Sequence, residues 1–266
     1  MHEGLHIALG AERLFTLWGI PITNTLISAW VVMAVLVIIA IVVGRNPKLI
    51  PGKIQSLFEM LFEFVLKYME DTLGTRQLAV RFFPLVATMF LFIFMSNLFN
   101  FLPFFGSVGI FENGELVPLL RPVNTDLNVT LALAIIAYLV IEITGIVILG
   151  FLKYGSKFVN FKEGVLGFAI GLIEFVSNFA RLISFSFRLF GNVFAGEVLI
   201  AVVVSFLPYV VPVPLMLFET FVGLVQAAIF ALLTLVFIKI AITEPHPSTG
   251  STTLTTGSSG QVSTHH

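Results

Sequence analysis

The stretch Ser184-Phe-Ser-Phe-Arg-Leu-Phe-Gly-Asn-Val-Phe-Ala-Gly-Glu197 places a charged arginine inside a long run of apolar residues. That run covers residues 163–206, and much of the chain on either side is apolar as well. An arginine at the centre of a bilayer costs roughly 3 kcal/mol on insertion scales, so such a residue faces protein or water and marks an ion pathway. The stretch therefore predicts a membrane protein in which Arg188 has a function.

The composition indicates a protein that crosses the membrane several times. Hydrophobic residues make up 58% of the 266 positions and charged residues 11%, whereas about a quarter of an average soluble domain is charged. The formal net charge of -1 argues against a nucleic-acid partner. The chain has no cysteine, which excludes disulfides, thiolate metal sites and cysteine nucleophiles.

Apolar runs long enough to cross a hydrocarbon core of roughly 30 Å predict an all-α integral membrane protein with five membrane helices. The predicted spans are 26–44, 82–102, 127–152, 163–206 and 212–243. An excess of lysine and arginine marks the cytoplasmic side. Six such residues lie between 45 and 81 and three between 153 and 162, against Arg13 and Arg121 on the other side. The N-terminus is predicted outside and the C-terminus in the cytoplasm.

Residues 53–73 predict an amphipathic helix, because polar side chains recur every three or four residues between hydrophobic ones. Within it, Glu63 and Lys67 have the spacing of an i,i+4 ion pair. The helix fits two placements. We favour one along the inner membrane surface; the alternative is a packing helix of the bundle.

The fourth predicted span is too long to stand upright in a membrane. Its 44 residues, from 163 to 206, would make a helix of roughly 66 Å, twice the hydrocarbon thickness. Either it is steeply tilted and embedded against a partner protein, or it is broken near Gly171 or Gly191. We treat 1–243 as a single membrane domain and expect the polar tail, 244–266, to be disordered.

The last two predicted helices form an antiparallel hairpin, and a turn near 207–208 brings their polar residues opposite one another. The pairs are Arg188 with Gln226, Glu197 with Glu219, and Glu174 with Lys239. A polar face inside a membrane needs water or a polar partner, since lipid offers no hydrogen bonds. Two facing acids suit a proton relay. Glu174 and Lys239 are explained equally well by an interfacial ion pair without a further role.

Three polar residues lie on the third predicted span or just before it. Asp126 and Asn128 are at its outer mouth, where Asp126 is explained either as a helix N-cap or as part of an ion entry. Glu142 lies about four turns further along. The sequence assigns Glu142 no partner.

The motif Phe187-Arg-Leu-Phe-Gly-Asn-Val-Phe-Ala-Gly-Glu197 resembles the signature of subunit a of the F-type ATP synthase, in its bacterial and chloroplast form. The resemblance covers nearly the whole chain in order, including the amphipathic helix. Further matches are Asp126-Leu-Asn-Val-Thr130, Glu174 fourteen residues before the arginine, and Gln226-Ala-Ala-Ile-Phe-Ala-Leu-Leu-Thr234.

The resemblance implies a non-catalytic stator subunit beside a rotating ring of c subunits, in a bacterial plasma membrane or a thylakoid. Arg188 would meet the ring carboxylate, with Gln226 as its neighbour. The outer half-channel would be lined by Glu197, Glu219, Asp126 and Asn128, the inner one by Glu174, with Asn192 also on the path. The family often has histidine at one of the two facing carboxylate positions, whereas this chain has glutamate at both.

The other partners that the resemblance implies are the b subunits of the peripheral stalk, further ATP synthase subunits and the lipid bilayer. No cofactor is expected. The main alternative is a stand-alone secondary transporter or channel, which would conduct ions as a lone chain. A membrane-embedded hydrolase fits less well, because the histidines lie near the termini, at 2, 6, 246, 265 and 266.

Overall fold

The computed structural model describes residues 13–17, 19–45, 52–100, 109–112, 115–118, 120–150, 154–155, 164–207 and 210–243. Over these ranges the chain forms six long helices, two short β-hairpins and one 3-10 turn. The tail 244–266, for which disorder is predicted, lies outside the described residues.

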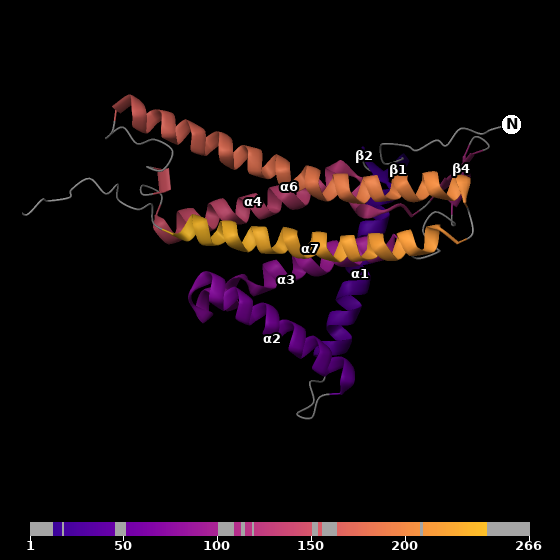
Figure 1. Ribbon diagram of the computed structural model, residues 1–266, viewed down its shortest axis with the longest axis horizontal. Helices are drawn as coiled ribbons and strands as arrows, with labels where there is room; N and C mark the ends of the chain where they lie inside the picture. Colours follow the sequence, from indigo (N-terminus) through magenta and orange to yellow (C-terminus); the bar gives the residue numbers. More distant parts are fainter. Residues whose placement is uncertain are drawn as a thin grey trace, which may run out of the picture.

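The elements follow one another along the chain as Figure 1 labels them. The described elements begin with a hairpin of β1 (Arg13–Leu17) and β2 (Ile20–Thr23). Three helices follow, α1 (Asn24–Gly44), α2 (Lys53–Leu73) and α3 (Arg76–Phe99), and then a second hairpin of β3 (Gly109–Glu112) and β4 (Glu115–Pro118). The remaining elements are η1 (Val123–Thr125), α4 (Leu127–Leu149), α6 (Gly164–Phe206) and α7 (Pro212–Ile242). Both strand pairs are antiparallel.

Five helices in the described residues are long and apolar enough to cross a membrane, which confirms the predicted fold class. They are Asn24–Gly44, Arg76–Phe99, Leu127–Leu149, Gly171–Phe206 and Pro212–Ile242. The amphipathic helix α2 has the predicted bounds. Helix α3 begins six residues before the predicted start at 82. Arginine is a good helix former, so the helix extends past the point where the apolar run begins.

Several helix ends have a local cause in the sequence. Gly74 ends α2 in the left-handed conformation, with φ of 83°, which glycine adopts without strain. Asp126 caps α4 by accepting a hydrogen bond from the backbone of Asn128. Pro212 opens α7, where a missing N–H costs no helical hydrogen bond.

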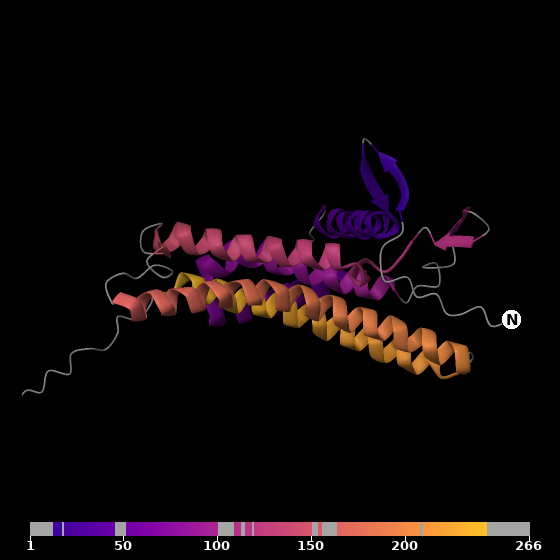
Figure 2. The same ribbon diagram turned by 90° about the horizontal axis from the view of Figure 1, so that it is seen from above.

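Helices α6 and α7 lie side by side and antiparallel along the length of the molecule in both views (Figure 1; Figure 2). Helix α6 is one continuous helix of 43 residues, so Gly171 and Gly191 do not break it. Helix α1 crosses this direction steeply and is seen nearly end-on in Figure 2. Helix α1 is itself a candidate span. If α1 crosses the bilayer upright, the α6–α7 hairpin, which it crosses steeply, is strongly tilted, as predicted.

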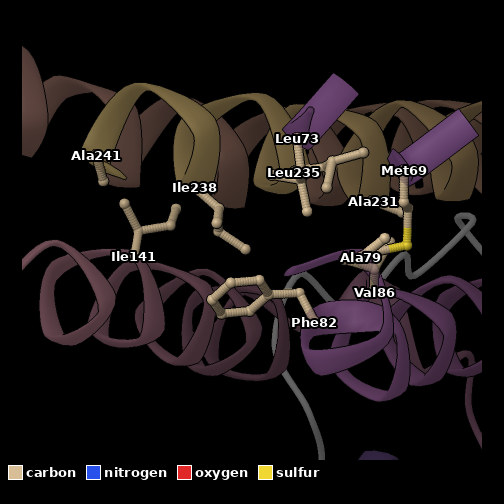
Figure 3. Close-up of a cluster of buried hydrophobic side chains, with 10 residues drawn as sticks. All are labelled: Met69, Leu73, Ala79, Phe82, Val86, Ile141, Ala231, Leu235, Ile238 and Ala241. Carbon is tan, nitrogen blue, oxygen red and sulfur yellow. The ribbon is translucent and has the colours of Figure 1, made fainter. Parts of the chain in front are cut away.

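Buried hydrophobic residues form three clusters in the described part of the chain. The smallest joins α1 to η1 through Ala29, Val32 and Val123, and the other two hold the remaining helices together. One joins α2 and α3 to α7, with Ile141 of α4 at its edge (Figure 3). The other joins α3, α4, α6 and α7, where small residues such as Ala134, Ala137 and Ala227 let the helices approach closely. In lipid, such packing replaces the hydrophobic effect as the force that joins helices.

Helix α2 contributes Met69 and Leu73 to the first cluster, so it packs against α3 and α7 at its C-terminal end. Its placement along the membrane surface stays a prediction. The expected pair of Glu63 and Lys67 is wrong. At this helix the described residues instead show an ion pair between Glu70 and Arg76, at 3.3 Å and largely in solvent.

Candidate ion path

Arg188 lies on the face of α6 that points away from the core. Its neighbours Phe185, Leu189 and Val193 are buried in the second cluster, whereas Arg188 is exposed beside the exposed ring of Phe187. Among the described residues Arg188 makes neither an ion pair nor a side-chain hydrogen bond. The packing of α6 therefore presents an uncompensated cation on an apolar outer face.

Gln226 of α7 is 3% exposed and accepts a hydrogen bond of 2.8 Å from Nδ2 of Asn192. Asn192 is one helical turn after Arg188, so the amide pair joins α6 to α7 just beyond the arginine. The Nε2 of Gln226 is buried and has no partner in the described part of the chain. The direct approach of Arg188 to Gln226 stays a prediction.

The structure brings Glu197 and Glu219 to one cavity of about 100 Å³ near the turn of the hairpin. Asn100, at the end of α3, also lines this cavity. Within the described residues, Oε2 of Glu197 and Oδ1 of Asn100 are buried without a hydrogen-bond partner. A water needs only about 10–15 Å³ of such space, so the cavity can hold several waters against these oxygens.

Glu219 reaches this position because residue 196 is glycine. A Cβ atom at Gly196 would overlap the carboxylate of Glu219. The next glycine back along α6, Gly191, has open space in the same place. The two glycines therefore differ: one makes room for a site residue and the other does not.

Asp126 is buried and accepts three side-chain or backbone donors. Thr25 of α1 donates to its Oδ2 at 2.8 Å, and Asn128 donates twice to its Oδ1, from the backbone at 2.9 Å and from Nδ2 at 3.0 Å. The N-cap role is thus present, and the carboxylate also fastens α1 to α4. An ion-entry role for Asp126 and for the exposed Asn128 stays a prediction.

A buried network of amide side chains next to the N-terminal end of α4 was not predicted from the sequence. Asn124 donates to Oδ1 of Asn97 at 2.7 Å, and Asn97 donates to the carbonyl of Gly223 at 3.0 Å. The network connects the turn η1 to α3 and α7. The signal that could have found it is Asn97, an amide inside an apolar span, together with Asn124 just before the third predicted span.

The predicted partners Glu174 and Lys239 have different surroundings. Glu174 is half-buried on α6 and interacts electrostatically with Arg181 and Tyr154. The ammonium of Lys239 donates to the carbonyl of Leu73 at 3.1 Å, at the C-terminus of α2. A cation is favourable there, because the last carbonyls of a helix carry partial negative charge. An ion pair between Glu174 and Lys239 stays a prediction.

The residues quoted for the family resemblance thus lie on α4, α6 and α7, which pack together. A family model described as ATP synthase A chain matches residues 26–239. The chain belongs to the ATP synthase subunit a family. The match begins within α1 and ends near the end of α7, so it spans all five candidate membrane helices.

Curated relatives of the subunit a family support this assignment. The chain is 34% identical to ATP synthase subunit a of Campylobacter jejuni subsp. jejuni (strain 81-176), over 78% of this chain and 84% of that protein. It is 32% identical to ATP synthase subunit a of Moorella thermoacetica, over 85% and 94%. It is also 33% identical to a protein of Propionigenium modestum named ATP synthase subunit a, sodium ion specific, over 90% and 81%.

Membership of the subunit a family makes this chain an integral membrane subunit of an ATP synthase, with other subunits of that complex as partners. The site contains carboxylates, amides and arginines. Over the described ranges no group of three His, Cys, Asp or Glu side chains could hold a metal ion. Among these side chains the carboxylates can accept and release a proton, whereas the arginines stay protonated.

Proposed function

We propose that this chain is the proton-translocating stator subunit of an F-type ATP synthase and forms two offset half-channels against a rotating ring of c subunits. Arg188 separates the two half-channels. The observation that carries the proposal is the exposure of Arg188 on α6 without an ion pair in the described structure. A cation so placed in a membrane helix needs an anionic partner from outside this chain.

In this mechanism a proton enters through the cavity between Glu197 and Glu219 and neutralises a ring carboxylate. The neutral carboxyl group can then face lipid without the cost of a bare charge. After nearly a full turn it reaches the inner path, which Glu174 lines, and loses its proton. The carboxylate is then attracted to Arg188.

Arg188 suits this role because its guanidinium stays protonated at any working pH. It cannot relay a proton by titrating, and it repels cations from a direct route between the half-channels. Gln226 and Asn192, hydrogen-bonded to each other, hold the neighbouring turn of α6 against α7. Protons therefore cross only when the ring turns.

The energetics require several protons for each ATP, because one charge crossing 100 mV supplies about 2.3 kcal/mol. The subunit itself forms no covalent bond. We place it in a bacterial plasma membrane, with the N-terminus outside and the C-terminus in the cytoplasm. The b subunits of the peripheral stalk would hold it fixed against the ring.

Arg188→Ala tests the function in membranes that contain the whole complex. We expect ATP synthesis to be lost while passive proton flux continues, because the barrier between the half-channels is gone. Arg188→Lys keeps the charge but loses the planar fork, so much of the activity should disappear. Arg81→Ala, which removes another exposed arginine from a membrane helix, is the control and should retain synthesis.

Normal ATP synthesis by Arg188→Ala membranes would refute the proposal. Proton flux through the purified chain alone in liposomes would favour the stand-alone transporter or channel instead. Because one relative is named sodium ion specific, synthesis should also be driven separately by a proton gradient and by a sodium gradient. Synthesis that requires sodium would overturn the choice of ion and keep the stator role.

A further inference from the structure

Helix α4 carries a carboxylate, Glu142, that the mechanism above does not use. It is half-buried near the C-terminal end of α4. That end of α4 lies at the end of the molecule away from the α6–α7 turn (Figure 1). Tyr154 donates its phenol hydrogen to Oε2 of Glu142 at 2.7 Å. Asn178 of α6 donates to Oε1 at the longer distance of 3.5 Å. Both oxygens of the carboxylate therefore have a donor.

Tyr154 is held in this position by close packing on α4. It is 5% exposed, and a Cβ atom at Gly145 would overlap its ring. Burial, followed by the hydrogen bond to Glu142, raises the pKa of the Tyr154 phenol, so the phenol stays protonated and remains a donor. Tyr138, one turn before Glu142, also interacts with the same carboxylate.

Charged groups face Glu142 from α6 as well. The guanidinium of Arg181 lies 3.8 Å from the ring centre of Phe237 on α7 and interacts electrostatically with both Glu142 and Glu174. Stacking on an aromatic ring fixes a cation without neutralising it. Over the described residues Arg181 is in no ion pair, and both carboxylates act on it electrostatically.

We propose that Glu142 is a second proton-carrying carboxylate of the inner half-channel, acting with Glu174 beside Arg181 and positioned by Tyr154 and Asn178. The proposal rests on the proposed function and deepens it. A carboxylate in a membrane helix is expensive, and such residues mark proton relays. If Glu142 only tied α4 to Tyr154, a neutral amide would make the same contact without a buried charge.

The step conserves atoms and charge. The proton that leaves the ring carboxylate forms an O–H bond with an oxygen of Glu142, and the ring carboxylate keeps the electron pair. Glu142 then gives this proton to water on the inner side and is again a carboxylate. Glu174 and Glu142 alternate as acceptors, while Arg181 stabilises whichever of them is charged.

The test uses the whole complex in membrane vesicles from which the catalytic head has been removed, in sodium-free buffer. Glu142→Gln keeps an oxygen for Tyr154 but cannot carry a proton. We expect passive proton flux per complex to fall, but by less than the roughly hundredfold or more that loss of a sole proton-transfer group causes, because Glu174 remains as an acceptor. The amount of assembled subunit should be unchanged. Glu142→Asp should restore part of the flux.

The pH dependence of flux at constant driving force provides the readout that a structural role would not change. The pH is changed equally on both sides of the membrane. Two acceptors, Glu142 and Glu174, serve the wild type and Glu174 alone serves Glu142→Gln, so the shape of the profile should differ between them, whereas a structural role would lower the flux without changing that shape. Gly145→Ala, which displaces the ring of Tyr154, should reduce flux, whereas Gly155→Ala, with open space around it, should not.

Wild-type flux and an unchanged pH profile in Glu142→Gln would overturn this inference. Arg188→Ala vesicles measured alongside keep it separate from the proposed function. If Arg188→Ala uncouples as expected while Glu142→Gln conducts normally, only the role of Glu142 fails. If Arg188→Ala membranes still make ATP normally, the stator mechanism fails, and this inference fails with it.

Discussion

The two ends of the α6–α7 hairpin hold their carboxylates in different ways. Near the turn, Glu197 and Glu219 line a cavity, and Oε2 of Glu197 is buried without a partner in the described structure. At the other end, Glu142 receives hydrogen bonds from Tyr154 and Asn178. The first arrangement leaves room for water against the acids, and the second fixes an acid by direct contacts. Under the proposed mechanism, the end near the turn, where protons enter, would depend on space for water. The release end, where Glu142 lies, would depend on the position of the acid.

We expect the largest loss of proton flux at the cavity between Glu197 and Glu219, because few other groups there could take over from these two acids. We predict that the double variant Glu197→Gln with Glu219→Gln loses about a hundredfold or more of the passive proton flux, in the range for a general acid–base group. Each single variant should retain more. Flux per assembled complex in stripped vesicles is the measurement. A double variant that conducts like the wild type would contradict the role of the cavity.

A second prediction tests whether Glu219 needs the space that Gly196 leaves for its carboxylate. Gly196→Ala places a methyl group against the carboxylate of Glu219 and should displace it, lowering flux without removing any charge. The comparison variant Gly44→Ala meets open space at the end of α1, away from this site, so it should be neutral. ATP-driven proton pumping measures both. Equal pumping by the two variants would show that Glu219 needs no fixed position.

Much of the fold could be predicted from sequence, because long apolar runs and the amphipathic pattern of 53–73 each have one simple explanation. Helices α2, α6 and α7 agree with their predicted bounds to within one residue. The start of α3 was missed because the sequence marks where apolar residues begin, which differs from where the helix begins. The two hairpins were missed because their strands have only four or five residues.

The site was predicted less completely, for reasons that particular residues show. Hairpin spacing brought Glu197 and Glu219 together because both lie on adjoining helices. The same reasoning could not find Leu73 as the partner of Lys239, since α2 is remote in sequence. It also left Glu142 unpaired, because Tyr154 and Asn178 reach it from outside its own helix. Contacts among three elements need tertiary structure.

The buried amide network gives a prediction for stability at the cavity end. Asn97→Leu removes the donor to the carbonyl of Gly223 and leaves the amide of Asn124 without its acceptor. An unsatisfied buried polar group costs about 1–3 kcal/mol, so the complex should dissociate or unfold at lower temperature. Thr88→Val on the exposed side of α3 is the control. An unchanged melting temperature for Asn97→Leu would show that the network adds no stability.

The smallest effect is expected where α2 meets α7. Lys239→Met removes the hydrogen bond to the carbonyl of Leu73 and the favourable charge at the C-terminus of α2. A hydrogen bond to a charged group contributes about 1.5–3 kcal/mol when fully formed, and the half-buried position of Lys239 reduces that value. Protease cleavage between α2 and α3, next to Leu73, should become faster, while flux stays near the wild-type value. If flux instead falls as far as in Glu142→Gln, then Lys239 belongs to the release end and its pairing with Glu174 regains support. Lys239→Arg distinguishes these outcomes, because it restores the contact with α2 through a longer side chain without supplying a group that can give up its proton.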